Sequence, residues 1–265
     1  MSRSADLIWT ATLAASLVSC SSSHETRTVE EVTTEVLVLG MIHSGHKTSE
    51  SYGLDTITEL VRAIDPDDIC VEIPPDRWPT AKAQLDAGEP VTEPRTSVFP
   101  EYVSAIFPLM GEMGFTIVPT AGWTREMADA RRAKLQEIEN DPARAEQWAE
   151  HELAIHRMGA DINELGAEDD PRVIHSSAYD DAIKRGYGGP YNTYFNDELG
   201  DGGWDNINAK HYGHIADHLD SVRGQGRRVL VTYGAAHKYW FLEQLRERDD
   251  VVLIDVSTFL DATGR

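Results

Sequence analysis

Basic side chains are scarce in this chain. Lys and Arg together number 24 against 45 Asp and Glu, which gives a formal net charge of −21. A surface of this sign raises the electrostatic cost of approaching a phosphate backbone or an anionic headgroup. We therefore expect the folded domain to bind neither nucleic acid nor an anionic membrane surface, and we expect the acidic excess to favour solubility.

Cysteine and long apolar runs are also rare. The chain has two cysteines, of which Cys70 lies inside the apolar run 69–71, where a small buried thiol is typical. Cys20 instead ends the apolar stretch 7–19, which is too short to span a membrane but has the length of a signal-peptide core. Because the other cysteine is buried, lipidation of Cys20 is favoured over a disulfide.

Residues 17–20, with the sequence LVSC, resemble the bacterial lipobox, in which the cysteine is lipidated and becomes the mature N-terminus. The resemblance implies a signal peptide over 1–19, a lipidated N-terminus at Cys20 and a polar tether over 20–33. The protein would then be exported and held at the cell envelope or outer surface by its lipid alone. The alternative is an ordinary signal peptide that is cut near Ser19.

Five apolar runs predict the strands of a sheet. They cover residues 36–39, 67–73, 115–118, 227–233 and 251–256. The first is apolar without alternation, which is typical of a parallel strand that is buried on both faces. A helical repeat over 54–64 joins it to the second run, so these elements form a βαβ unit. We expect a single α/β domain over 34–265, with a mainly parallel central sheet flanked by helices.

The middle of the chain has a different character. Residues 124–158 are rich in Ala, Glu, Arg and Gln, which predicts one or two long amphipathic helices broken near Asp141-Pro142. Residues 159–206 are rich in Gly, Asp, Asn and Tyr. We expect the segment from about 124 to 206 to be a helical and loop insertion over the carboxyl ends of the strands. Further helices are predicted over 78–87, 102–113, 211–222 and 235–248.

Two of the predicted strands are followed by the same Gly-x-x-His pattern. Gly40 and His43 follow the first strand, Gly234 and His237 follow the fourth, and Glu72 ends the second. Glycine permits a sharp turn that would present each histidine at the edge of the sheet. Because ligands of open parallel sheets bind at the carboxyl ends of the strands, we expect His43, Glu72 and His237 to meet in one crevice.

The chemistry of such a group leaves two alternatives. Two imidazoles and one carboxylate, here His43, His237 and Glu72, can hold a divalent transition metal (Zn, Mn, Co or Fe) and leave a position open for water. Without a metal, Glu72 would orient or charge-stabilise a histidine that acts as base. Taken singly, each residue also has a structural alternative, as a loop histidine, a histidine at a helix N-terminus or a surface acid.

Residues 36–72 and 229–256 resemble the TraB, PrgY and Tiki superfamily, whose relatives include erythromycin esterase and haem-binding ChaN-like proteins. The resemblance rests on the two Gly-x-x-His motifs and on Glu72. A further family feature, an Arg-Asn pair, is half present as Ile207-Asn208. The resemblance implies a hydrolase that acts on a peptide or a small-molecule ester, as a metal-dependent peptidase or an esterase. It also implies two alternatives, a haem- or metal-binding surface lipoprotein and a non-catalytic factor that sequesters a peptide.

Other histidines could approach this group. His46 lies near the first motif in the sequence, and His211, His214 and His218 recur at helical spacing, so they are expected to share a helix face. His46, Asn208, His211 and His214 are therefore candidates for an additional contact or metal ligand. The alternative for the three helical histidines is a solvated helix face.

We expect lipidation at Cys20 to be required for membrane attachment. A Cys20→Ser variant should lose its lipid and leave the membrane fraction, because the nucleophilic thiol that carries the acyl chains is gone. Mass spectrometry of the N-terminal peptide and fractionation of cells measure both effects. Wild-type protein that is found in the cytoplasm with residues 1–19 intact would contradict export.

Overall fold

A computed structural model describes residues 32–260. The predicted signal peptide and Cys20 lie outside the described residues, as does nearly all of the predicted tether 20–33. Within residues 32–260, no helix is both long enough and apolar enough to cross a bilayer.

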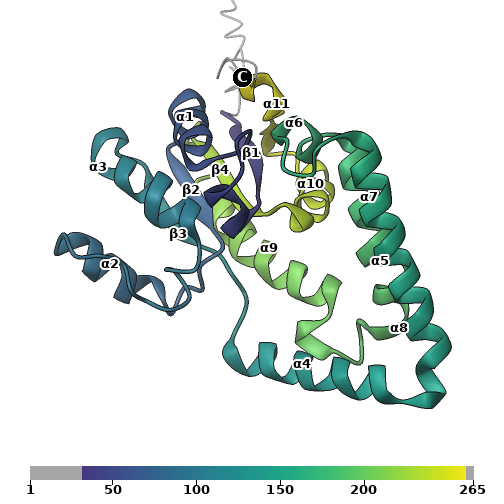
Figure 1. Ribbon diagram of the computed structural model, residues 1–265. Helices are drawn as coiled ribbons and strands as arrows, with labels where there is room; N and C mark the ends of the chain where they lie inside the picture. The colour runs from purple at the N-terminus through teal and green to yellow at the C-terminus, as the bar shows by residue number, and fades with distance from the viewer. Residues whose placement is uncertain (1–31, 261–265) are drawn as a thin grey trace, which may run out of the picture. The chain divides into compact units, whose positions relative to one another are not determined.

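The described chain has a five-stranded sheet in which every pair of neighbouring strands is parallel. The order of the strands is β3-β2-β4-β1-β5. Their bounds are β1 Thr34–Met41, β2 Asp68–Val71, β3 Thr116–Pro119, β4 Arg228–Gly234 and β5 Val251–Leu253. The prediction of an α/β fold with a parallel central sheet flanked by helices is confirmed (Figure 1).

Helices make up most of the rest of the described chain. The α-helices are α1 Leu54–Ile64, α2 Trp78–Asp86, α3 Met110–Met113, α4 Arg125–Asn140, α5 Ala145–Leu165, α6 Pro171–Ile174, α7 Ser177–Gly186, α8 Asn192–Phe195, α9 Trp204–Ser221, α10 Lys238–Arg246 and α11 Ser257–Leu260. Short 3-10 or π-helical segments cover His43–Lys47, Glu101–Ile106, Phe107–Leu109, Pro142–Arg144, Tyr187–Tyr191, Gly200–Gly202 and Ala235–His237.

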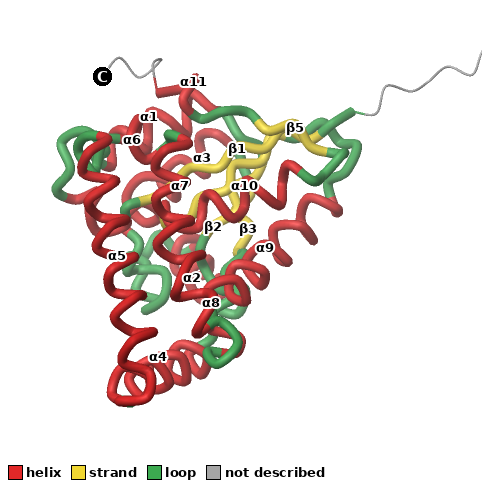
Figure 2. The backbone as a smooth tube through the Cα atoms, turned by 90° about the vertical axis from the view of Figure 1, so that its right-hand side faces the viewer, coloured by secondary structure: helices red, strands yellow, loops and turns green. Residues whose placement is uncertain are grey.

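Alternate side chains of the strands belong to two apolar cores, one on each face of the sheet. Leu37 and Leu39 of β1 pack in the core that includes the buried side chains of α1. Val36 and Val38 pack in the core that includes buried side chains of α9 and α10. Full burial of one such side chain stabilises the fold by roughly 1.5–3 kcal/mol. Both faces of β1 are therefore packed against apolar side chains, which explains why its sequence is a continuous apolar run. Figure 2 shows α10 in front of the strands.

The place of β4 in the sheet decides which strand ends are neighbours. β4 pairs with β1 from Glu35–Arg228 to Met41–Gly234, and with β2 from Asp68–Val229 to Val71–Thr232. It therefore lies between β1 and β2. Because all three strands run in the same direction, their carboxyl ends stand next to one another at one edge of the sheet.

The helix predicted over 102–113 is broken into short pieces. The π-helical segment Glu101–Ile106 passes into the 3-10 segment Phe107–Leu109 and then into α3. Pro108 lacks a backbone N–H and cannot donate the bond that a regular α-helix requires at its position. Glu101, which is fully buried, is the first residue of the π-helical segment.

The helix predicted over 211–222 begins at Trp204 instead, as α9. Trp204, Ile207 and Asn208 already occupy the buried face of this helix. The preceding Gly-rich segment, Gly200–Gly203, conceals this start in the sequence, because such residues are typical of loops. The earlier start places Trp204 and Asn208 on the same helix face as His211.

The predicted insertion is helical in both halves, because the long helices α4 and α5 are followed by the shorter helices α6, α7 and α8. The break near residue 141 occurs as predicted, since α4 ends at Asn140 and α5 begins at Ala145. The described chain has no strand between Pro119 and Arg228. Figure 1 shows α4 (teal) on the side of the sheet toward which the β1 arrow points. Each of these two long helices buries only one side chain, Ile138 in α4 and Ile162 in α5.

We expect the amides of α4 and α5 to exchange with solvent faster than the amides of α1. A helix with few buried contacts opens locally at low cost, whereas α1 buries Thr56, Ile57, Leu60, Val61 and Ile64. Hydrogen exchange followed by mass spectrometry on peptides from α1, α4 and α5 measures the difference. Equal protection of the three helices would contradict a weakly held insertion.

Candidate functional site

The ends of β1 and β4 bring the two Gly-x-x-His segments side by side. In the register of the sheet, Gly40 pairs with Tyr233 and Met41 pairs with Gly234. Figure 1 shows these strands as neighbours. The two motifs are therefore offset by a single residue, and both histidines follow at the same edge.

Close packing, and not a turn, explains the two glycines. Gly234 has a φ of −46°, and Gly40 is not among the described residues with positive φ. A Cβ at Gly234 would lie 2.7 Å from Nε2 of His43, and a Cβ at Gly40 would lie 3.1 Å from Cα of Ala235. The turn falls instead on His43, whose φ of 50° is rare for a residue other than glycine. The expectation that the glycines supply the turn is therefore wrong.

His43 lies between two carboxylates. Its Nδ1 donates a hydrogen bond to Oε1 of Glu101 at 2.7 Å, and its Nε2 is 3.7 Å from Oε2 of Glu72. Glu101 is fully buried, and its Oε2 has no hydrogen-bond partner among the described residues. The side chain of His43 is 35 % exposed, so this imidazole connects the two acids with the surface.

Backbone hydrogen bonds fix the position of Glu72. Its Oε2 accepts from the N–H of Gly234 at 2.9 Å. Its own N–H donates to the Tyr102 hydroxyl at 2.8 Å, and this hydroxyl donates to the carbonyl of Thr232 at 2.9 Å. Glu72 is thus held where the ends of β2 and β4 meet, and it is hydrogen-bonded to Gly234 of the second motif.

His237 is oriented by two residues of α9. Its Nδ1 lies 2.7 Å from Oδ1 of Asn208, and the amide nitrogen of Asn208 donates to the carbonyl of Trp204 at 2.8 Å. Because that second bond fixes the amide, Oδ1 faces the imidazole and Nδ1 must be the donor. Nε2 of the neutral ring therefore carries a lone pair. The Trp204 indole stacks on the ring, with centroids 4.8 Å apart and planes 16° apart.

The surroundings of the two motif histidines shift their pKa values in opposite directions. Burial lowers the pKa of His43, but the hydrogen bond to Glu101 and the charges of Glu72 and Glu101 outweigh it, so this pKa lies above 6.5. Burial lowers the pKa of His237 below 6.5; the charge of Glu72 opposes this shift and that of His43 adds to it. Between the two pKa values, His43 is protonated and His237 is neutral.

His211 lies against His237 and is fully buried. The two rings are perpendicular, with centroids 5.3 Å apart. Nδ1 of His211 accepts from the N–H of Gly122 at 2.8 Å, so the proton of the neutral ring is on Nε2, which has no partner among the described residues. Burial, with the charges of His237 and His214, holds the pKa of His211 well below 6.5.

The other candidate histidines do not join this group. His46 uses both ring nitrogens on backbone groups, since Nε2 accepts from Ile42 at 3.0 Å and Nδ1 donates to the Tyr52 carbonyl at 2.7 Å. His214 is exposed, whereas His211 is buried. The two residues are neighbours on α9, as their spacing predicts, but of the two only His211 is buried.

The site has some of the features of a metal centre. With bonds of ~2.0–2.1 Å, two tetrahedral ligands stand about 3.4 Å apart, close to the 3.7 Å between Nε2 of His43 and Oε2 of Glu72. Oxygen acceptors hold the Nδ1 atoms of His43 and His237, as is usual for metal-binding histidines. Among residues 32–260, no group of three His, Cys, Asp or Glu is arranged to hold an ion. A metal site formed by His43, Glu72 and His237 stays a prediction.

Comparisons with protein-family models, with curated proteins and with solved structures give no match for this chain. The resemblance to the TraB, PrgY and Tiki superfamily rests on the two Gly-x-x-His motifs and Glu72, and it stays a prediction.

Two residues of the site have no place in the sequence-based prediction, Glu101 and Trp204. Glu101 directly precedes the apolar run 102–113, and an acid at the entry to a buried helix is a signal that could identify it. Trp204 lies one helical turn before Asn208, so it could be identified once the start of α9 is known.

We expect Gly234→Ala to disrupt the site while the fold is retained. The new Cβ would lie 2.7 Å from Nε2 of His43 and 3.6 Å from Oε2 of Glu72, so the imidazole must move. The NMR signals of His43 should shift, and any activity should fall by about tenfold or more. Gly213→Ala in α9 is the matched control, because a Cβ there meets no atom within 4 Å. Unchanged His43 signals in Gly234→Ala would contradict the described packing.

Proposed function

We propose that this protein is a hydrolase that cleaves an ester or peptide bond with a water molecule activated by His237. One observation carries the proposal: two neighbouring histidines each have Nδ1 held by an oxygen acceptor, and their pKa values are shifted in opposite directions. Such a pair supplies a base and an acid at the same pH.

His237 is suited to the role of the base. Its neutral Nε2 takes a proton from water while the water oxygen bonds to the carbonyl carbon of the substrate. Asn208 accepts the hydrogen bond from Nδ1–H and keeps the ring in the required tautomer. The nearby charge of Glu72 stabilises the imidazolium that forms, because it favours the protonated state of His237.

His43 is suited to the role of the acid. Its protonated Nε2 donates to the leaving oxygen or nitrogen as the bond to the carbonyl carbon breaks. Glu101 and Glu72 favour the protonated ring, and the exposed part of the side chain gives the substrate access to it. Solvent then removes the proton from His237 and returns one to His43, which restores both residues.

A metal-assisted form of the same reaction is the second candidate. The 3.7 Å between His43 Nε2 and Glu72 Oε2 favours it. His43, Glu72 and His237 would hold a Zn, Mn, Co or Fe ion, which would supply an acidified water. Metal analysis of wild type and of His43→Ala tests it, because a ligand role requires bound metal that the variant loses. A Soret band would instead indicate haem.

We expect kcat/KM for an ester with a poor leaving group, such as ethyl acetate, to have a bell-shaped pH dependence, because the alkoxide must be protonated as it leaves. Activity should rise as His237 loses its proton, below pH 6.5, and fall as His43 loses its proton, above pH 6.5. Glu101→Gln removes a charge that raises the pKa of His43, so the descending limb should move to lower pH. His237→Gln should lower kcat/KM by roughly 10²–10⁴-fold.

The matched control for His237→Gln is His214→Gln, because His214 is an exposed histidine outside the site. Circular dichroism of each variant shows whether the fold is retained. Full activity of a folded His237→Gln variant would overturn the proposal. So would a panel of esters and peptides that the protein leaves intact both as purified and after loading with Zn, Mn, Co or Fe.

A further inference from the structure

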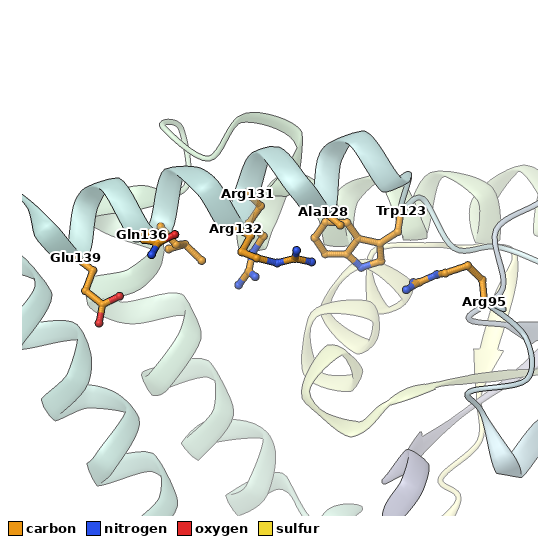
Figure 3. A pocket seen from close by; sticks show the side chains of 8 residues that line it. Arg95, Trp123, Ala128, Arg131, Arg132, Gln136 and Glu139 are labelled. Atoms are coloured by element: carbon orange, nitrogen blue, oxygen red, sulfur yellow. The ribbon is translucent and has the colours of Figure 1, made fainter.

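A cavity of about 550 Å³ lies between α4 and the loop before the π-helical segment. Its size is that of a small-ligand site. Its lining consists of Arg95, Trp123, Ala128, Arg131, Arg132, Leu135, Gln136 and Glu139. Figure 3 shows Arg95 and Arg132 pointing toward Trp123 from opposite sides.

The arginines of this cavity are poorly neutralised. Arg95 has no carboxylate within ion-pair distance among the described residues. Arg131 donates to the neutral hydroxyl of Tyr191 at 2.8 Å. Within residues 32–260, the acid paired with Arg132 is Asp129 of the same helix, at 3.5 Å. Positive charge therefore remains available at this end of the cavity.

Several arginines elsewhere in the described chain are closely paired with acids. Arg144, Arg185 and Arg248 contact carboxylates at 2.6 or 2.7 Å. In a chain with 45 acidic against 24 basic side chains, three arginines that line one cavity are a local concentration of positive charge. The acid in the lining, Glu139, lies beyond Gln136 at the far end of α4 from Trp123 (Figure 3).

The cavity is joined to the candidate catalytic residues through Trp123. Its ring contacts the ring of His211, with centroids 6.3 Å apart, and the N–H of the preceding Gly122 donates to His211. His211 in turn lies against His237. His237 itself does not line the cavity. A ligand bound beside Trp123 would be separated from His237, the proposed base, by the rings of Trp123 and His211.

We propose that this cavity binds an oxyanion group of the substrate, a carboxylate or a phosphate, between Arg95, Arg132 and the indole of Trp123. Guanidinium groups suit both anions, because their forked N–H donors match two oxygens at once. The inference rests on the proposed function, because it takes the bound anion to be part of the ester or peptide that the protein hydrolyses.

The first test measures binding without catalysis. Isothermal titration of the full chain with glutarate, with glycerol phosphate and with neutral glutaramide compares the charged and uncharged probes. Either anion should bind more tightly than glutaramide, and the tighter anion distinguishes a carboxylate from a phosphate. Arg95→Gln and Arg132→Gln should each weaken binding of the tighter anion by about tenfold. Arg125→Gln is the matched control on α4, because Arg125 does not line the cavity.

The second test measures selectivity in catalysis. The ratio of kcat/KM for the 4-nitrophenyl half-ester of dodecanedioate, whose chain is long enough to extend past two rings, to that for 4-nitrophenyl dodecanoate should fall about tenfold in Arg95→Gln and remain unchanged in Arg125→Gln. Equal binding of glutarate, glycerol phosphate and glutaramide, or anion binding that survives in both Arg95→Gln and Arg132→Gln, would overturn the anion site. Anion binding that depends on these arginines, without hydrolysis of any ester, would leave the anion site standing and count against the proposed function alone.

Discussion

The in-register pairing of β1 with β4 is the constraint on which the rest of the candidate site depends. The strands pair without interruption from Glu35–Arg228 to Met41–Gly234. A slip of one residue would exchange the side chains of the two apolar cores between the faces of the sheet. Core packing therefore fixes the register, and the register fixes the separation of the two motifs. The paired ends of β1 and β4 therefore bring the two motifs to the same edge of the sheet, and His43 and His237 follow in short 3-10 segments.

The burial of Glu101 is the second constraint. A carboxylate taken out of water loses several kcal/mol of solvation unless it is paired, and the partner of Glu101 is His43. His43 thus contributes to stability as well as to the proposed chemistry. Removal of its imidazole would leave the acid without a compensating donor, so the stability of a His43 variant has to be measured before lost activity is assigned to catalysis.

The apolar runs in the sequence predict both the sheet and three residues of the candidate site. Buried parallel strands are continuous apolar runs, so the position of each strand is visible and His43, Glu72 and His237 follow directly from strand ends. Glu101 and Trp204 could not be placed in this way. Glu101 lies 58 residues from His43 and follows a loop with no periodic pattern. Trp204 opens a helix whose start is concealed by glycines, and only tertiary packing brings it against His237.

The left-handed backbone of His43 restricts what this position can become. At a φ of 50°, glycine, asparagine and aspartate are tolerated, whereas valine and isoleucine clash with their own backbone. A descendant that lost the chemistry but kept the fold would therefore drift toward Gly, Asn or Asp at this position and would avoid β-branched residues. The residue found there separates homologues that kept the imidazole from those that kept only the turn.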